Sequence, residues 1–389
     1  MNKKLVVRTR IAPSPTGFPH IGTIYHVLID YAYARKHQGK FILRLEDTDR
    51  NRFVIGAEEG IYDALKWFGL PPDENPLHGG PFGPYRQSER LPIYKKYVKE
   101  LLAKDHAYYC FCTKERLEEM RKKQEEQHQP PMYDKHCRNL DPSQVQKQLD
   151  SGLAHVVRMK IPENRKIVLK DVVSGTIEFD SNLIDDQVIL KSDGFPTYHL
   201  GVVVDDHLME ISHVFRGKEW ISSTPKHILL YEFFGWTMPV HGHLPLILNA
   251  DGKGKLSKRH GHASVDYYRT LGYLPEAVLN YLSHIVWNHP EGKEIYNLEE
   301  FIKLFEIEKI TSQAPRFDLQ KLDWINKEYI RAMPVEILYE RLVQFDSSIG
   351  ALTKIKVLSV LPLIKERLKV LSEFWFLAGF LFEKPKKIE

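Results

Sequence analysis

The first stretch of the chain with a recognisable pattern is VVRTRIAPSPTGFPHIGT, residues 6–23. Val, Thr and Ile interleave with arginine over residues 6–11, which predicts a strand that Pro13 and Pro15 bring to an end. The loop that follows is rich in glycine and proline and leads into a helix-like segment at residues 23–37. A helix N-terminus after a parallel strand presents N–H groups and a partial positive charge, so it is suited to binding phosphate.

The elements after this loop extend the same pattern. FILRL, residues 41–45, predicts a second strand, and residues 57–68 predict an amphipathic helix with Ile61, Leu65 and Phe68 on one face. Strand, loop, helix, strand and helix in this order predict a βαβ unit. The fold class expected is therefore α/β, with a doubly wound, parallel, Rossmann-type sheet.

The pattern of expected helices and strands changes after about residue 101 and again after residue 204. An α+β insertion is predicted between these positions, with a helix at 115–127 and strands at 155–161, 167–173 and 176–180. A strand at 211–215 and a helix at 224–234 return to the βα pattern. Helices dominate after residue 261, and Pro334 and Pro362 suit the first turns of two late helices.

Composition and charge narrow the class of protein. The 389 residues carry 55 Lys and Arg against 51 Asp and Glu, a net charge of +4 that is too even to indicate a nucleic-acid binder without local clustering. Three cysteines cannot close a disulfide framework, so a reduced compartment is expected. The N-terminus turns charged before a signal peptide could develop, and the longest apolar run, residues 374–382, is about half of what a membrane span needs. We therefore expect a cytoplasmic protein without membrane contact.

Two loops contain residues suited to nucleotide chemistry. His20 in the first loop could donate a hydrogen bond to phosphate, and Gly22 would let a flat base approach the backbone. KLSKR, residues 255–259, places Lys255 and Lys258 three residues apart on a glycine-flanked loop that can close over a polyphosphate. Taken alone, the first loop more simply indicates a histidine that caps a helix, and the second a solvated basic loop.

Together, the two loops resemble the pair of signature elements of class I aminoacyl-tRNA synthetases, with HIGT at residues 20–23 and KLSKR at residues 255–259. The likeness to the glutamyl-tRNA synthetases is the most specific and runs from about residue 6 to residue 329. It rests on RIAPSPTG (10–17), RLEDTDR (44–50), GPYRQSER (83–90), SDGFPTYHL (192–200), VDDH (204–207) and RGKEW (216–220).

The resemblance implies ATP-dependent ligation of L-glutamate to tRNA. The α-carboxylate of glutamate would attack the α-phosphate of ATP to give an adenylate and pyrophosphate, and a ribose hydroxyl of tRNA would then take the acyl group. Positioning and charge stabilisation would dominate this chemistry, with Mg²⁺ accompanying ATP. The catalytic residues it implies are His20, Lys255 and Lys258. The ATP-binding residues it implies are Pro13, Thr16, Gly17, His20, Gly22, Glu219, Lys255, Ser257 and Lys258.

The choice of amino acid follows from charge. A side-chain carboxylate is best held by the planar fork of arginine, and an α-amino group by a carboxylate. By resemblance, the glutamate-binding residues are Arg10, Ala12, Ser14, Glu46, Tyr198 and Arg216. Two cationic forks would not favour glutamine. Two positions depart from the family, namely Val202, where many members have Asn, and Lys218, where an acidic or neutral residue is common.

The cysteines form a third candidate site. Cys110 and Cys112 are separated by one residue, and Cys137 follows 25 positions after Cys112, a spacing of thiolates that suits zinc. Some relatives complete such a site with a His two residues after the last Cys, where this chain has Asn139. Tyr133 or His136 could complete the shell instead, and loss of the site is the other interpretation.

The resemblance also assigns roles to segments of the chain. Residues 1–100 and 205–255 would form the two halves of the catalytic domain, and 101–204 the insertion that binds the tRNA acceptor end. Residues 256–330 would form a helical domain that contacts the stem, and 331–389 the start of a helical anticodon-binding domain. The expected partner is a glutamate-specific tRNA, with a glutamine-type tRNA left open, and the expected state is a monomer. The aromatic run at 374–382 either packs on its own domain or faces a further C-terminal domain.

Two other functions fit parts of the sequence. A shorter paralogue attaches glutamate to a modified tRNA base, but the helices at 334–382 extend beyond the point where it would end. A non-catalytic tRNA-binding relative or scaffold would be expected to lose His20, Lys258 or the arginines, and all are present.

Overall fold

The computed structural model describes residues 6–49, 52–256 and 263–382. The chain divides into two compact units. Unit 1 comprises residues 1–16, 38–53 and 72–243, and unit 2 comprises residues 17–37, 54–71 and 244–389. The domain boundaries at residues 100, 204, 255 and 330 stay predictions.

Unit 1 combines short strands with helices. Its strands are β1 (Arg8–Ile11), β2 (Lys40–Leu43), β3 (Ala107–Cys110), β4 (Val156–Met159), β5 (Lys166–Asp171), β6 (Gly175–Asp180), β7 (Val188–Leu190), β8 (His213–Gly217) and β9 (Val240–Leu244), the last ending one residue beyond the unit. Its α-helices are α3 (Leu91–Ala103), α4 (Lys114–Glu126), α5 (Pro142–Asp150), α6 (Tyr198–Leu208) and α7 (Thr224–Phe234). Short 3₁₀ helices are η2 (Gln87–Arg90), η3 (Ser181–Leu183) and η4 (Lys218–Ser223).

The strand pairings confirm the predicted α/β class. β1 and β2 pair in parallel, with Arg10 opposite Ile42, and the connection between them contains α1 (Ile21–Lys36). β8 follows Ser212, whose N–H donates to the carbonyl oxygen of Arg8 in β1 at 3.0 Å. This is the βαβ order that the sequence predicts.

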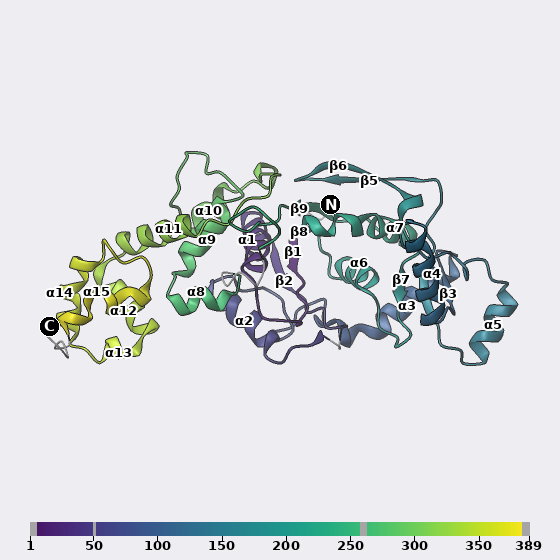
Figure 1. The fold of residues 1–389 in the computed structure, drawn as a ribbon, viewed down its shortest axis with the longest axis horizontal. Helices are drawn as coiled ribbons and strands as arrows, with labels where there is room; N and C mark the ends of the chain where they lie inside the picture. The colour runs from purple at the N-terminus through teal and green to yellow at the C-terminus, as the bar shows by residue number, and fades with distance from the viewer. Residues whose placement is uncertain (1–5, 50–51, 257–262, 383–389) are drawn as a thin grey trace. The chain divides into compact units, whose positions relative to one another are not determined.

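Two further sheets complete unit 1. β3, β4 and β7 form one, and β6, β5, β9 and β8 form the other. Figure 1 shows β5 and β6 as a long hairpin, and β5 also pairs in parallel with β9 through Asp171 and His241. The segment predicted as an insertion therefore shares a sheet with strands that follow residue 204.

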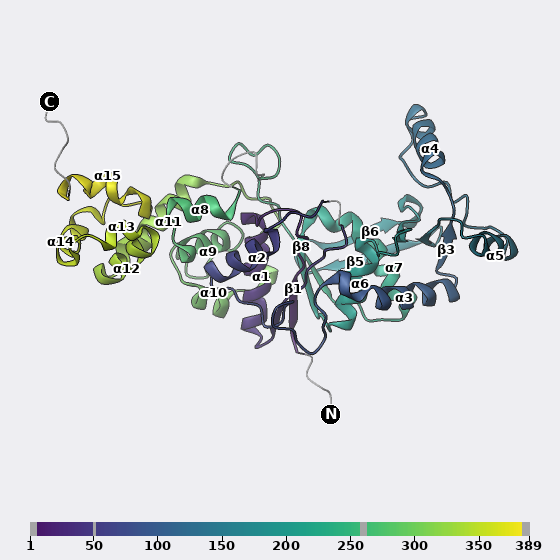
Figure 2. The same ribbon diagram turned by 90° about the horizontal axis from the view of Figure 1, so that it is seen from below.

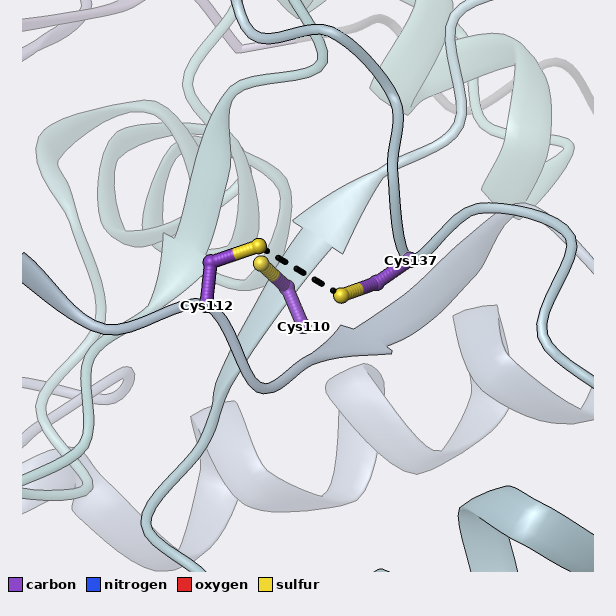
Figure 3. Close-up of side chains that lie close together, drawn as sticks. All are labelled: Cys110, Cys112 and Cys137. Atoms are coloured by element: carbon purple, nitrogen blue, oxygen red, sulfur yellow. Dashed lines mark hydrogen bonds between the residues drawn. The ribbon is translucent and has the colours of Figure 1, made fainter. Parts of the chain in front are cut away.

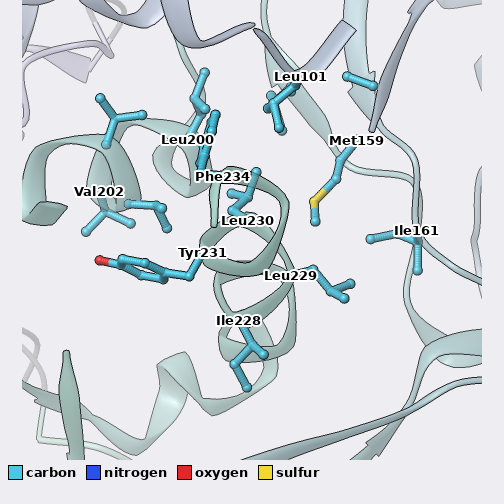
Figure 4. Close-up of a cluster of buried hydrophobic side chains, with 14 of the residues drawn as sticks. Leu101, Met159, Ile161, Leu200, Val202, Ile228, Leu229, Leu230, Tyr231 and Phe234 are labelled. Atoms are coloured by element: carbon cyan, nitrogen blue, oxygen red, sulfur yellow. The ribbon is translucent and has the colours of Figure 1, made fainter. Parts of the chain in front are cut away.

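The apolar core of unit 1 lies between helices and the β3–β4–β7 sheet. Side chains of α3, β4, α6 and α7 gather there (Figure 4), and burying each of them stabilises the fold by roughly 1.5–3 kcal/mol. Val202 is one of these core residues and packs in a cluster that contains Leu200 and Ile228. The valine at this position is therefore part of the apolar core.

Unit 2 is mainly helical in its described residues. Besides α1 it contains α2 (Ala57–Trp67), α8 (Val265–Leu271), α9 (Pro275–His284), α10 (Leu298–Leu304), α11 (Leu319–Ala332), α12 (Val335–Phe345), α13 (Ser347–Gly350), α14 (Lys354–Ile364) and α15 (Phe374–Ala378). The 3₁₀ helices η6 (Ile307–Lys309), η7 (Leu371–Glu373) and η8 (Gly379–Leu381) lie among them. Helices α12 to α15 gather into one bundle (Figure 2).

The predictions for the late helices are partly wrong. Pro334 is the N-cap of α12, one residue before the first turn. Pro362 lies inside α14 rather than in a first turn. Burial of Val357, Leu361 and Ile364 holds the helix together through the proline, which lies only two residues before its end.

The aromatic run near residue 380 packs with one face only. Phe374 is buried, whereas the side chains of Phe376 and Phe380 are 86% and 72% exposed. Within residues 6–49, 52–256 and 263–382, no helix has the length and apolar character needed to cross a bilayer.

Candidate active site

A buried network of opposite charges lies at the ends of β1, β2 and α6. Arg10 makes a two-fold contact with Asp206, with Nε to Oδ1 and Nη2 to Oδ2 both at 3.1 Å. Arg44 donates to the same Asp206 at 2.7 Å and to Glu46 at 3.1 Å. Burial raises the pKa of the Asp206 carboxyl, but Arg10 and Arg44 outweigh burial and leave it below its usual value. Asp206 therefore stays charged and balances Arg10.

Glu46 lies in the same network with the opposite pKa shift. Burial raises the pKa of its carboxyl, although Arg44 and Arg10 oppose that shift. Its backbone N–H donates to the carbonyl oxygen of Pro13 at 3.0 Å. The loop that contains Ala12 and Ser14 is thereby fixed beside Glu46, so three of the predicted glutamate-binding residues come together.

Arg216, in β8, is buried without an acidic partner. Its Nε donates to His243 Nε2 at 3.0 Å, its Nη1 to Tyr198 Oη at 3.1 Å, and its Nη2 to Thr224 Oγ1 at 2.7 Å. Nη1 also donates to His227 Nδ1 at 3.2 Å. Among the residues that the structure describes, no carboxylate lies within ion-pair distance of this guanidinium, although Arg216 is only 6% exposed. Its positive charge is held in place by neutral acceptors.

The histidines around Arg216 are electrically neutral. Burial lowers the pKa of His243, and Asp171 only partly opposes this effect. Burial, followed by the charge of Arg216, lowers the pKa of His227 well below its usual value. His199, which contacts His227 at 3.1 Å, has a pKa lowered by burial to about 3. Arg216 is therefore a cation among uncharged neighbours.

Tyr198 connects the two charged regions. Its hydroxyl accepts from Arg216, and burial raises its pKa. The charges of Arg216, Glu46 and Arg10 all act on this pKa. The predicted binding residues Arg10, Glu46, Tyr198 and Arg216 thus converge within unit 1.

His20 caps α1 in unit 2. Its Nδ1 accepts from the N–H of Gly22 at 2.9 Å, as the simpler interpretation of this loop required. A Cβ on Gly22 would come within 3.1 Å of the same nitrogen, so glycine suits the cap. Because Nδ1 accepts, the ring proton is on Nε2, the atom that could donate to a phosphate.

The basic loop begins on a short hairpin of unit 2. Leu248 bridges to Lys255, and Leu256 N donates to Ile247 O at 2.9 Å. Ser257 and Lys258, both predicted ATP-binding residues, lie outside the described residues. After the loop, Ala263 O accepts from Ile21 N at 2.8 Å and Ser264 bridges to His20. The segment that follows KLSKR is therefore bound directly to the first loop.

The remaining predicted ATP-binding residues lie on loops, except Glu219, which lies on a 3₁₀ helix. In unit 1, Thr16 N donates to the carbonyl oxygen of Ser14 at 2.8 Å, which tightens the turn after Pro13. Gly17 begins unit 2 and has φ of 159°, an extended backbone. Glu219 is exposed on η4, and its carboxylate folds back over Gly217. Lys218 begins the same 3₁₀ helix.

The three cysteines form a compact group. Their sulfur atoms all lie within 4.8 Å of one another (Figure 3), and Cys112 Sγ is 3.5 Å from Cys137 Sγ. Tyr133 Oη lies 3.3 Å from the sulfurs of both Cys110 and Cys112. A hydrogen bond from Cys137, with further help from Tyr133, lowers the pKa of Cys110 to about 4.

Tyr133, rather than His136, is placed to complete this group. His136 is exposed, and its backbone N–H donates to Asp134. The group of metal-ligating residues in the described chain contains only the three cysteines, without the His136 ring.

Sequence reasoning missed the second layer of the Arg216 site. The sequence pattern includes Asp206 only as part of VDDH and gives it no role, and no motif marks Asp171, His227 or His243. A polar–small–polar alternation, HGH at residues 241–243 in an otherwise apolar strand, is the signal that could have marked His243.

Known proteins match the chain along most of its length. The family model of the catalytic domain of class I tRNA synthetases for glutamate and glutamine matches residues 6–324. A glutamate–tRNA ligase of Cellvibrio japonicus is 50% identical over 376 residues, which are 96% of this chain and 73% of that protein. Another, of Gloeobacter violaceus, is 52% identical over 337 residues, which are 87% of this chain and 63% of that protein.

Solved structures of glutamate tRNA ligases also resemble this chain. The crystal structure of a glutamate tRNA ligase from Elizabethkingia meningosepticum, in complex with its amino acid, has a TM-score of 0.92 and 38% identity. The match covers 98% of this chain and 81% of that one. The chain therefore belongs to the glutamate–tRNA ligases, within the class I tRNA synthetases.

Proposed function

We propose that this chain joins L-glutamate to tRNA in two steps, through a glutamyl-adenylate formed from ATP. The observation that carries the choice of amino acid is Arg216, a buried cation whose hydrogen-bond acceptors are all neutral. Burying an unbalanced charge is expensive, so the site favours a ligand that brings a negative charge. The side-chain carboxylate of glutamate supplies it, and the amide of glutamine does not.

The two arginines then have different tasks. Arg216 takes the substrate carboxylate together with Tyr198, whose hydroxyl already lies at 3.1 Å from Nη1. The charge of Arg10 is balanced by Asp206, so Arg10 orients the substrate through hydrogen bonds rather than attracting it by net charge. Glu46, Ser14 and the backbone of Ala12 face the α-amino group, which a carboxylate attracts.

ATP is bound by groups from the two signature loops. His20, with its ring proton on Nε2, donates to a phosphate, while Pro13, Thr16, Gly17 and Gly22 shape the backbone around the nucleotide. Lys255, Ser257 and Lys258 neutralise charge on the transferring phosphate, and Glu219 contacts the nucleoside. Mg²⁺ accompanies ATP and shields its phosphate charge. The enzyme's contribution is alignment and electrostatic stabilisation.

The partner is tRNA for glutamate, and glutamine-type tRNA is a second candidate for charging. In this scheme the protein acts as a cytoplasmic monomer. Segment 101–204 binds the acceptor end, and the helices after residue 256 take the stem.

The cysteine group fits a zinc ion. Tetrahedral zinc with Zn–S bonds of about 2.3 Å places its sulfur ligands about 3.8 Å apart, and the sulfurs of Cys112 and Cys137 lie 3.5 Å apart. Cys110, Cys112, Cys137 and Tyr133 would hold the metal. There it would cross-link β3 to the loop at residues 133–137 and take no part in the chemistry.

The test is glutamate-dependent ATP–pyrophosphate exchange, with and without tRNA and with glutamine as a control substrate. We expect exchange with glutamate and not with glutamine, and the requirement for tRNA shows whether tRNA completes the site. Arg216→Lys keeps the charge but loses the fork, and should lower kcat/KM for glutamate by about 100-fold, or ~2.7 kcal/mol. Arg165→Lys, at an exposed ion pair with Glu232, is the matched control and should change nothing. Equal use of glutamine, or an unaffected Arg216→Lys enzyme, would overturn the assignment.

A further inference from the structure

We propose that Asp171 and His243 are positioning residues for amino-acid recognition: Asp171 fixes the ring proton of His243, so that His243 holds the guanidinium of Arg216 without neutralising it. This inference rests on the proposed function, because Arg216 is the group that would bind the carboxylate of glutamate. Neither residue would touch the substrate.

The three groups form a continuous buried chain. His243 Nδ1 lies 2.6 Å from Asp171 Oδ2, and Arg216 Nε lies 3.0 Å from His243 Nε2. His243 is fully buried, and Asp171 and Arg216 are each 6% exposed. This run of hydrogen bonds forms because Asp171 is the last residue of β5, at the point where that strand pairs with β9, which contains His243.

The direction of each hydrogen bond is fixed by chemistry. A guanidinium can only donate, so His243 Nε2 must accept, and a carboxylate can only accept, so Nδ1 must donate. The oxygen Oδ1 of Asp171 accepts from the N–H groups of Val173 at 3.0 Å and Ser174 at 2.7 Å. Asp171 therefore selects the one ring tautomer that Arg216 requires.

The acceptors on Arg216 imitate a carboxylate without its charge. Nε and Nη2 lie on one edge of a guanidinium, and here they donate to His243 Nε2 and Thr224 Oγ1. These two acceptors are 3.3 Å apart. An acidic residue in this place would bind the same edge more strongly but would cancel the charge that attracts glutamate. A neutral histidine orients the fork and leaves its charge for the substrate.

Asp171→Asn tests the tautomer directly. The backbone N–H groups of Val173, Ser174 and His243 all donate to Oδ1 and keep the amide oxygen on that side. The amide NH₂ then faces His243 Nδ1, and also the His243 N–H that lies 3.0 Å from Oδ2. The ring must then accept at Nδ1 and carry its proton on Nε2, pointed at the N–H of Arg216. We expect KM for glutamate to rise on the order of ten- to a hundredfold, with KM for ATP unchanged. Asp180→Asn is the matched control, since Asp180 also accepts from a backbone N–H, that of Asn182, and contacts no histidine.

A pair of variants at His243 separates orientation from packing. His243→Gln can place its amide oxygen near Arg216 Nε and should retain most of the affinity for glutamate, whereas His243→Leu cannot and should lose it. In the His243→Gln background, Asp171→Asn should have little further effect, because no tautomer remains to be selected. A merely structural role predicts equal effects on the KM values of both substrates and additive losses in the double variant.

The outcomes are distinguishable. If the unmodified enzyme shows no glutamate-dependent exchange, the proposed function fails. If it is active and Asp171→Asn leaves KM for glutamate unchanged, or if Gln and Leu at residue 243 behave alike, the positioning role fails alone. Should Asp171→Asn not fold, the comparison of His243→Gln with His243→Leu decides the question.

Discussion

Arg10 and Arg216 are both buried arginines, yet their charges are balanced in opposite ways. Arg10 is paired twice with Asp206, and Arg44 shares the same carboxylate. Arg216 contacts hydroxyl and imidazole groups instead. The fold therefore pairs one cation with a carboxylate, whereas the other has only neutral side-chain acceptors among the described residues.

Asp206→Asn should show how much the internal pairing contributes. The change leaves two buried guanidinium groups without their shared counter-ion, which costs about 3–5 kcal/mol of the free energy of unfolding. Urea denaturation measures that loss. Asp105→Asn, which removes an exposed pair with Lys160, should cost under about 1 kcal/mol. Similar losses in the two variants would contradict this account of the network.

The sequence predicts site residues only where a motif marks them. Arg10, Glu46, Tyr198 and Arg216 all belong to motifs of the family, and the structure brings them together. Asp171 and His243 are 72 residues apart and belong to no motif, so their contact depends on the pairing of β5 with β9. Such a partner becomes visible only when the strands are placed.

At the level of elements, local sequence patterns predict that a helix or strand exists more reliably than they predict where it begins and ends. α7 begins and ends at the predicted residues because Pro225 lies in its first turn and Gly235 closes it with φ of 72°. α1 begins two residues earlier than predicted because His20 caps it. The prediction that Pro362 lies in a first turn is wrong because tertiary burial of α14 outweighs the local preference of proline.

Gly272 offers a test of one element junction. It closes α8 with φ of +75°, and a Cβ there would lie 2.7 Å from the Cβ of Leu371 in η7. Gly272→Ala should therefore lower the free energy of unfolding by ~1 kcal/mol, because alanine is strained at a left-handed φ. The clash with Leu371 should lower it further. Gly235 has nearly the same φ, and a new methyl there would meet open space. Gly235→Ala should therefore be destabilised by the backbone strain alone. Equal thermal midpoints for the two variants would contradict the packing argument.

The cysteine group makes a prediction at the same scale. If it binds zinc, the purified chain should contain about one zinc per molecule, and Cys137→Ser should lose it. A strong chelator should lower the thermal midpoint of the unmodified chain and leave that of Cys137→Ser unchanged. Between the two candidate fourth ligands, Tyr133→Phe should weaken zinc retention and His136→Ala should not. The reverse order would show that the tyrosine is only a neighbour.

For the whole molecule, net charge is a poor guide to function. An overall charge of +4 gives no sign of a nucleic-acid partner, because a net charge does not say where on the surface the charges cluster. The class of fold follows from the βαβ pattern near residue 6, and the family from motifs spread over about 320 residues. The grouping of neutral histidines around Arg216 arises only from the three-dimensional fold.

These histidines also set how stability depends on pH. Burial lowers the pKa of His199 and His241 to about 3 and that of His227 well below its usual value. Below about pH 6.5 the unfolded chain therefore binds protons that the folded chain does not, so stability is full above that pH and falls as the pH drops.

The diagnostic window lies between about pH 6.5 and pH 5, because carboxylates with lowered pKa, such as Asp206, lose their contribution only at lower pH. Each histidine contributes up to ~1.4 kcal/mol per pH unit there, which urea midpoints measured across the window would reveal. His241→Gln removes one titrating group and should flatten the slope, whatever it does to stability at neutral pH. A slope that is absent, or unchanged in His241→Gln, would mean that these rings gain protons without unfolding the protein.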